Sequence, residues 1–144
     1  MQTRIGVAAL LVPVLLAGVP FFQSAASAAD SGGAAAVAEH PPKEAAAMIR
    51  EYGSREDFVL LDVRTPLEYG VERLAGAVRI DYYSATFREE LGHLDRGKTY
   101  LVYCRTGNRS GKTASLMEEM GFRNVHHLSG GIVKWKEDGL PTVR

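Results

Sequence analysis

The sequence predicts an α/β domain with a mainly parallel central sheet that is flanked by helices on both faces. Apolar runs with strand character alternate with helical patterns, which is typical of βαβ units. The run at residues 58–63 is apolar enough for a strand buried on both faces. A chain of 144 residues has room for one such domain, which we place at residues 42–144.

The N-terminal 28 residues have the pattern of a signal peptide. A short basic start precedes an apolar stretch at residues 5–22, and small residues fill 23–29. Cleavage after Ala28 is favoured, with Ala29 as the alternative. An uncleaved anchor is disfavoured, because prolines and a glycine interrupt the stretch and a span needs ~20 apolar residues. We therefore expect a periplasmic or secreted protein without stable membrane association.

The first half of the domain is expected to contain one helix and two strands. A flexible lead-in rich in glycine and alanine, residues 29–41, precedes the domain. Two prolines followed by an alanine-rich segment predict a helix over residues 43–52. The run 58–63 predicts a strand that a threonine–proline pair ends, and residues 77–80 predict a short second strand.

The second half repeats the alternation of helix and strand. A helix is expected between residues 84 and 94, followed by a strand over residues 99–103. Apolar residues recur at helical spacing over 110–120 until a glycine ends the pattern. Residues 125–128 predict the fourth strand, and residues 132–137 predict the last helix.

Cys104 is the only cysteine, and it directly follows the strand expected at residues 99–103. Ligands of open parallel sheets gather at the carboxyl ends of strands, and backbone N–H groups of a strand-to-helix loop favour anions. Cationic neighbours and a helix N-terminus lower a cysteine pKa. A single cysteine forms no disulfide within the chain. We therefore predict that Cys104 is an exposed, reactive thiolate.

The rest of the loop suits the binding of a negatively charged group. A guanidinium group matches two oxygens of an oxyanion, so we predict that Arg105 and Arg109 bind one, with Arg109 the stronger candidate. Backbone groups of the remaining residues would shape the cradle, and Ser110 could also cap the following helix. These residues are Thr106, Gly107, Asn108 and Ser110.

Three blocks of sequence carry a resemblance to a known family. They are Leu-Leu-Asp-Val-Arg-Thr-Pro-Leu-Glu-Tyr at 60–69 with Ala-Gly-Ala at 75–77, Cys-Arg-Thr-Gly-Asn-Arg-Ser at 104–110, and a closing block at 121–125, 130–135 and 139–141. In this order and spacing they resemble the rhodanese (thiosulfate sulfurtransferase-like) family, and more closely its exported single-domain members of the phage-shock type.

The resemblance implies a rhodanese-like fold and an activity. Cys104 would take a sulfane sulfur from thiosulfate or a similar small-molecule donor, become a persulfide, and pass the sulfur to cyanide or a thiol. One segment departs from the family pattern. Where the family commonly reads Gly-His-Ile-Pro-Gly-Ala, residues 72–77 read Glu-Arg-Leu-Ala-Gly-Ala, so Arg73 stands in place of the histidine.

Two other enzyme classes and a non-enzymatic role are alternatives to this activity. Cysteine-dependent phosphatases need Cys-x5-Arg, but the sixth residue after Cys104 is Ser110. A thioredoxin-like oxidoreductase lacks its second cysteine. A non-catalytic rhodanese-like module that binds a persulfide, an oxyanion or a partner protein stays open.

Several other side chains of chemical interest are expected to be structural. Adjacent strand residues point to opposite faces, so His126 and His127 cannot share one site, and we expect surface or core roles for them and for His93. We interpret Asp62 and Arg64 as a structural ion pair.

The balance of acidic and basic residues argues against partners that are bound through a large charged surface. Acidic and basic residues number 17 each and form no blocks, so we expect no binding to nucleic acid. No metal-ligand pattern or Gly-rich phosphate loop stands in the sequence, so we predict no metal and no cofactor.

Overall fold

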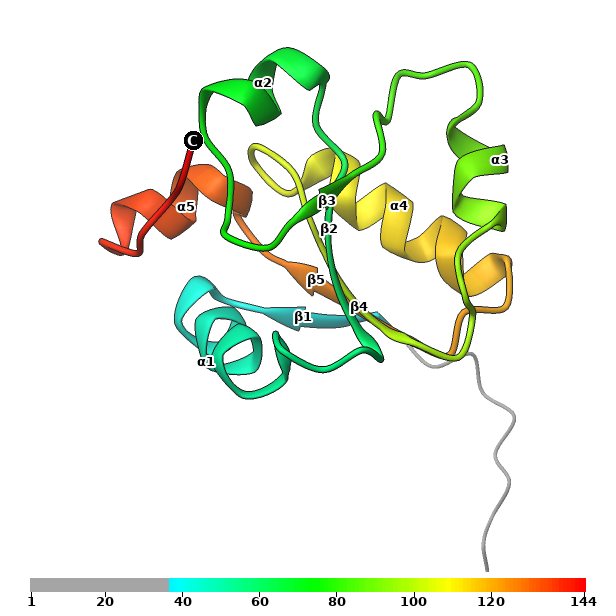
Figure 1. Ribbon diagram of the computed structural model, residues 1–144, viewed down its shortest axis with the longest axis horizontal. Helices are drawn as coiled ribbons and strands as arrows, with labels where there is room; N and C mark the ends of the chain where they lie inside the picture. Colours follow the sequence, from blue (N-terminus) through cyan, green and yellow to red (C-terminus); the bar gives the residue numbers. More distant parts are fainter. Residues whose placement is uncertain (1–36) are drawn as a thin grey trace, which may run out of the picture. The chain divides into compact units, whose positions relative to one another are not determined.

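The computed structural model describes residues 37–144, which form a five-stranded sheet with the order β1-β5-β4-β2-β3 (Figure 1). Every neighbouring pair of strands is parallel, so the predicted α/β fold is confirmed. The strands are β1 Ala38–His40, β2 Phe58–Asp62, β3 Val78–Arg79, β4 Thr99–Tyr103 and β5 Asn124–Leu128. The helices are α1 Pro42–Tyr52, α2 Pro66–Val71, α3 Phe87–Gly92, α4 Asn108–Glu119 and α5 Gly131–Glu137.

Helices cover both faces of the sheet, as predicted. Figure 1 shows α1 and α5 on one side of the strands and α3 and α4 on the other. Successive residues of β4 alternate between the two cores: Tyr100 and Val102 pack with α3 and α4, whereas Leu101 and Tyr103 pack with α1 and α5. This alternation explains why the central strands are apolar at nearly every position.

Two elements differ from the sequence prediction. We expected Thr65 and Pro66 only to end a strand, but they begin α2. The Thr65 hydroxyl accepts from the backbone N–H of Glu68 at 3.3 Å, and the Glu68 carboxylate accepts from the backbone N–H of Thr65 at 3.0 Å. This capping box, with proline at the first helical position, is a helix signal readable from the sequence.

Strand β1 lies inside the segment expected to be a lead-in. It pairs with β5 in register Ala38↔His126 and is only three residues long. The proposed signal peptide and most of the proposed lead-in lie outside the described residues. Within residues 37–144, no helix is long and apolar enough to cross a bilayer.

Asp62 and Arg64 form a buried ion pair at the end of β2, which confirms their structural role. Arg64 Nη2 lies 2.6 Å from Asp62 Oδ2, and the side chains are 3% and 0% exposed, respectively. The same Nη2 donates to the carbonyl of Glu72 at 2.8 Å. The phenolic oxygen of Tyr103 accepts from the backbone N–H of Leu74 at 3.1 Å. The segment that departs from the family pattern is therefore held by β2 and β4.

Arg73, which stands where the family has a histidine, joins this segment to the C-terminus. Its backbone N–H and carbonyl each bond to Val143 at 2.8 Å, and its guanidinium lies 4.8 Å from the Tyr69 ring centroid. Arg73 thus packs against Tyr69 and pairs the backbone with the C-terminal segment. Gly76, three residues later, has a left-handed φ of 79°.

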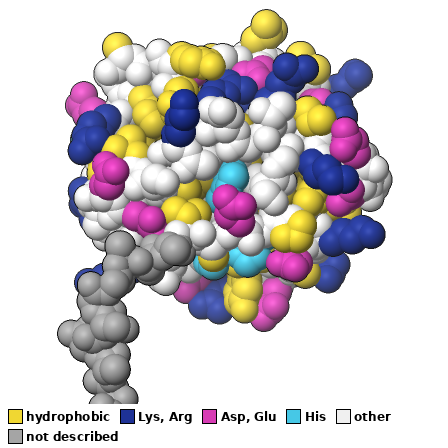
Figure 2. All heavy atoms as spheres, turned by 180° about the vertical axis from the view of Figure 1, so that it is seen from behind, with side chains coloured by type: hydrophobic (Ala, Val, Ile, Leu, Met, Phe, Trp, Pro, Cys, Tyr) yellow, Lys and Arg dark blue, Asp and Glu magenta, His cyan; other side chains and the backbone are white. Residues whose placement is uncertain are grey.

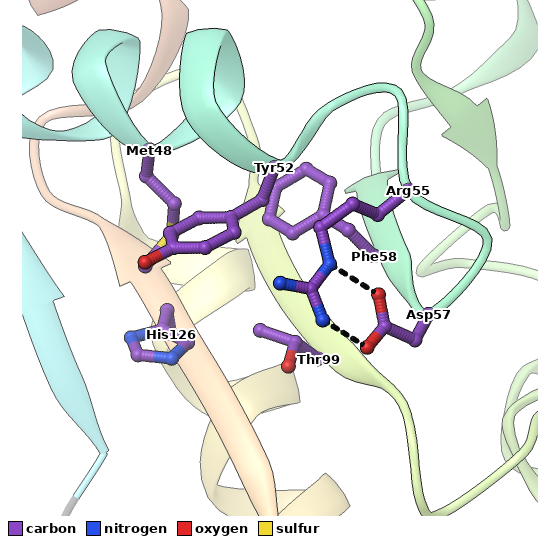
Figure 3. Close-up of a pocket in the computed structure, with 7 residues that line it drawn as sticks. All are labelled: Met48, Tyr52, Arg55, Asp57, Phe58, Thr99 and His126. Carbon is purple, nitrogen blue, oxygen red and sulfur yellow. Dashed lines mark hydrogen bonds and ion pairs between the residues drawn. The ribbon is translucent and has the colours of Figure 1, made fainter.

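Replacing Asp62 by Asn is predicted to destabilise the protein by ~3–5 kcal/mol, because the buried Arg64 guanidinium loses its counter-charge. The free energy of unfolding in urea measures this. The control is Asp57→Asn, since Arg55 and Asp57 form the same kind of pair on the surface, with side chains 54% and 56% exposed (Figure 3). We expect less than ~1 kcal/mol there. Equal losses in the two variants would contradict the role of burial.

Candidate active site

The Cys104 loop joins the end of β4 to the start of α4. Gly107 precedes α4 with a left-handed φ of 98°. A Cβ on Gly107 would lie 3.1 Å from the backbone nitrogen of Gly130 and 3.5 Å from Nε2 of His127. Glycine is therefore required here both by the backbone conformation and by the close packing of the loop.

The sulfur of Cys104 is surrounded by hydrogen-bond donors. The backbone N–H of Gly107 donates to Sγ at 3.1 Å, and the hydroxyl of Ser110 donates to it at 3.3 Å. Burial raises the pKa of Cys104. The Ser110 hydroxyl and the backbone N–H groups of Ser110, Gly107 and Thr106 together lower it by more than burial raises it, so the pKa lies below its ordinary value. Neutral donors thus favour the thiolate.

The prediction that the thiol is exposed is wrong. Cys104 is 1% exposed and packs in the core under α4 with Ala114 and Met117. The sulfur is therefore held inside the protein and not displayed on the surface of the loop.

The first turn of α5 keeps the carbonyl groups of the loop away from the sulfur. The backbone N–H of Ile132 donates to the carbonyl of Cys104 at 2.9 Å, and that of Val133 donates to the carbonyl of Arg105 at 3.0 Å. Gly131 allows this approach, since a Cβ there would lie 2.5 Å from both carbonyl oxygens. The loop can therefore direct its N–H groups inward.

Arg109 is joined to Glu68 by two hydrogen bonds, a pairing that we did not predict. Nη1 donates to Oε2 at 2.9 Å and Nη2 donates to Oε1 at 2.7 Å. The hydrogen bond from Arg109, with those from Thr65, holds the pKa of Glu68 at about 2, well below 4.5. The Arg109 guanidinium, which we predicted to bind an oxyanion, here binds the Glu68 carboxylate. Arg109 could bind an oxyanion through the same N–H groups only if its ion pair with Glu68 broke.

Arg105, Thr106 and Asn108 are exposed at the outer side of the loop. Arg105 lines a cavity of about 360 Å³ with Leu67, Val71, Val133 and Lys136 among its neighbours. Arg64 and Lys136 in this lining are paired with Asp62 and Glu72. Within residues 37–144, no ion pair involves the Arg105 guanidinium, and the two carboxylates that also line this cavity, Glu68 and Glu72, are paired with Arg109 and Lys136.

His127 contacts the Cys104 loop, which we did not predict. It is 6% exposed, and its Nε2 lies 3.1 Å from the carbonyl oxygen of Gly107 and 3.0 Å from Oγ of Ser110. The signal in the sequence was its position at the carboxyl end of a strand beside β4, but alternation alone does not say which of two adjacent histidines faces the loop.

The two histidines do lie on different faces, as predicted. Nδ1 of His126 lies 2.9 Å from Nε2 of His40, and burial together with His40 lowers the pKa of His126. Figure 2 shows histidine side chains gathered beside acidic ones on the face turned to the viewer. His93, for which we also expected a surface or core role, is exposed at the end of α3.

Residues 41–138 match the family model of the rhodanese-like domain. The chain belongs to the rhodanese-like family. The resemblance inferred from the three sequence blocks is therefore confirmed at the level of the family and the fold.

Three similar proteins show how far the likeness extends. An uncharacterized protein of Synechocystis is 33% identical over 69% of this chain and 55% of its own length, and a sulfurtransferase of Allochromatium vinosum is 27% identical over 69% of this chain and 92% of its own. The solved structure of a rhodanese-related protein from Thermoplasma volcanium has a TM-score of 0.63, with 29% identity over 74% of this chain and 97% of that one. This chain thus spans about half of one of these relatives and nearly all of the other two.

A second cavity lies at the opposite end of the sheet from Cys104. It has a volume of about 320 Å³ and is lined by Phe58 and Thr99, the first residues of β2 and β4, with Met48, Tyr52 and His126 (Figure 3). Its lining contains no cysteine, and Arg55 and Asp57 at its rim are paired with each other. Within residues 37–144, no group of three or more His, Cys, Asp or Glu side chains could hold a metal ion. The Cys104 loop is therefore the better candidate for the active site.

The Glu68–Arg109 pair predicts a pH-dependent stability. Because the pKa of Glu68 is depressed from 4.5 to about 2, the stabilisation is complete above pH 4.5 and is lost as the pH falls toward 2. Glu68→Gln should cost roughly 1–2 kcal/mol at neutral pH, a value reduced by partial exposure. Urea unfolding at several pH values should show this difference shrink on acidification. The exposed Glu137→Gln is the control, and a pH-independent difference for Glu68→Gln would contradict the assignment.

Proposed function

We propose that this rhodanese-like protein is a sulfurtransferase that carries sulfur on Cys104. The observation that supports this best is the pair of donors on Sγ, from Gly107 at 3.1 Å and from Ser110 at 3.3 Å, in a loop whose carbonyls are turned away. Such a cradle stabilises a sulfur anion without a base. A relative that spans nearly the same domain is named a sulfurtransferase.

The proposed reaction with thiosulfate balances without proton transfer. The Cys104 thiolate attacks the outer, sulfane sulfur of thiosulfate and forms a new S–S bond. The old S–S bond breaks, and sulfite leaves with its electron pair. Cyanide or a thiolate then attacks the terminal sulfur of the persulfide, which returns Cys104 as a thiolate and releases thiocyanate or an acceptor persulfide.

We also propose that the reaction takes place outside the cytoplasm, in an exported single-domain member of the family. This proposal rests on the signal-peptide pattern of residues 1–28. A reactive cysteine in an oxidising compartment is protected when it is stored as a persulfide or buried. The 1% exposure of Cys104 is consistent with such protection.

Cys104→Ser is predicted to abolish thiocyanate formation from thiosulfate and cyanide, because the variant lacks the sulfur nucleophile. Mass spectrometry of the wild-type protein after thiosulfate treatment should show an increment of ~32 Da on Cys104, the mass of one sulfur atom. Equal rates from the two proteins would overturn the mechanism. A wild-type protein that neither turns over nor gains mass would indicate the non-catalytic binding module instead.

Arg105→Ala is predicted to raise KM for thiosulfate about fivefold, in keeping with ~1 kcal/mol for an exposed charge interaction. The Arg105 guanidinium lines the cavity beside the loop and has no carboxylate partner in the described chain, so it is available to the anionic donor. The control is Arg123→Ala, which removes another exposed charge, directly before β5. The same change of KM in both variants would indicate a general charge effect and contradict a site role.

A further inference from the structure

His127 supports the Cys104 loop from β5 without a hydrogen bond to the sulfur. Its Nε2 has two polar neighbours, the carbonyl oxygen of Gly107 at 3.1 Å and Oγ of Ser110 at 3.0 Å. Oγ of Ser110 in turn lies 3.3 Å from Sγ of Cys104. One imidazole nitrogen is thus a single hydroxyl group away from the proposed nucleophile.

The surroundings of the ring determine which nitrogen carries the proton. A carbonyl oxygen only accepts, so the contact between Nε2 and Gly107 is favourable only when Nε2 is an N–H donor. Nδ1 is buried and has no hydrogen-bond partner among residues 37–144, since Oε1 of Glu39, 3.6 Å away, lies beyond hydrogen-bond distance. A buried N–H without an acceptor is costly, so the neutral ring is better accommodated with its proton on Nε2.

Among the residues that the structure describes, Glu39 is the charged side chain that pairs with the imidazole. Glu39 of β1 places Oε1 3.6 Å from Nδ1, but its side chain is 68% exposed. From α4 the ring meets Ser110 and Gly111, where a Cβ would lie 3.5 Å from Cε1. Its register partner on β4 is Val102. A second proton on Nδ1 would therefore face Glu39 and would leave the donor on Nε2 in place.

The donor on Nε2 decides where the Ser110 hydroxyl points. The carbonyl of Gly107 has two lone pairs, and it accepts from the backbone N–H of Gly111 at 2.9 Å as well as from Nε2 of His127 at 3.1 Å. Oγ of Ser110 also lies 3.2 Å from this oxygen, so the hydroxyl hydrogen has two acceptors within reach, the Gly107 carbonyl and Sγ of Cys104. Both lone pairs of the carbonyl are already occupied by the other two donors, and Nε2 has no free lone pair to accept from Ser110. The hydroxyl hydrogen of Ser110 is then left for Sγ of Cys104.

We propose that His127 is a positioning residue for the sulfur anion on Cys104. Its Nε2–H holds the Gly107 carbonyl outside the cradle and makes the Ser110 hydroxyl a donor to the sulfur. The importance of this for sulfur transfer rests on the proposed function, whereas the effect on the thiolate does not.

His127→Phe keeps a ring of similar shape but removes the donor. We expect the thiolate fraction of Cys104 at a pH below its pKa to fall about tenfold, as the pKa rises by about one. Titration of the ultraviolet absorbance of the thiolate measures this without a sulfur donor or an alkylating reagent. His127→Gln, which can offer a side-chain N–H near the former Nε2, should recover most of the thiolate. His126→Phe, on the opposite face of β5, should leave the pKa of Cys104 unchanged.

The Ser110→Ala background separates positioning from a loss of packing. If His127 acts through the Ser110 hydroxyl, His127→Phe should change the pKa of Cys104 much less in that background. An unchanged pKa in the single variant, or a full additional change in the double variant, would overturn the proposal. NMR of the wild-type imidazole nitrogens should show the proton on Nε2, and a ring protonated only on Nδ1 would overturn it even if His127→Phe fails to fold.

The proposed function can fail separately from this role. A wild-type protein without sulfur transfer in which His127→Phe still lowers the thiolate fraction would refute the sulfurtransferase activity and support the positioning role. An active wild-type protein in which His127→Phe leaves the thiolate fraction unchanged would support the sulfurtransferase activity and refute the positioning role.

Discussion

The outward orientation of the loop carbonyls is the constraint on which the site depends. A loop that directs several N–H groups at one sulfur must find partners for its carbonyl oxygens elsewhere, since buried carbonyls are costly when unpaired. The first turn of α5 donates to the carbonyls of Cys104 and Arg105, and α4 together with His127 donates to the carbonyl of Gly107. The cradle is therefore a product of three elements, although its donors to the sulfur, from Gly107 and Ser110, come from one short stretch of chain at the start of α4.

A second set of contacts fixes the rim of the site to the loop. Glu68 completes the capping box that begins α2 and also binds Arg109 on α4, so α2 cannot shift without disturbing the helix that carries Ser110. The buried Arg64 ties the end of β2 to the carbonyl of Glu72 beyond α2. Each end of α2 is thereby attached by a charged group, which compensates for a helix of six residues in which no side chain is fully buried and only Tyr69 packs partly against the core.

Local sequence patterns were sufficient for most of the fold and for the position of Cys104. Strand β4 and the loop after it are contiguous, so Cys104 could be placed at the end of a strand from the sequence alone. The capping box of α2 was present in the sequence and we overlooked it. Strand β1 has no such signal, because three exposed or half-buried residues become a strand only by pairing with β5.

The contacts that escaped prediction join residues distant in sequence. Glu68 and Arg109 are 41 residues apart, and His127 is 20 residues from Gly107. Hydrophobic periodicity gives the face on which a side chain lies, but it does not say which polar atom it meets. The burial of Cys104 was missed for the same reason, since it depends on how α4 packs over the end of β4.

The charge arrangement around the loop fits a reaction in which one negative charge moves from the thiolate sulfur to the terminal sulfur of a persulfide and the net charge stays the same. Thiolate and persulfide each carry one negative charge, so neutral donors can hold both states without reorganisation. A permanent cation in contact with the sulfur would favour the anion but also oppose the departure of an anionic product. Here Arg64, Arg109 and Lys136 are each matched by a carboxylate, and Cys104 accepts its hydrogen bonds from neutral groups. Among the described residues of the cavity beside the loop, Arg105 is thus the cation without a carboxylate partner. In the proposed reaction its charge would attract the anionic donor from outside the cradle without holding the sulfur that is passed on.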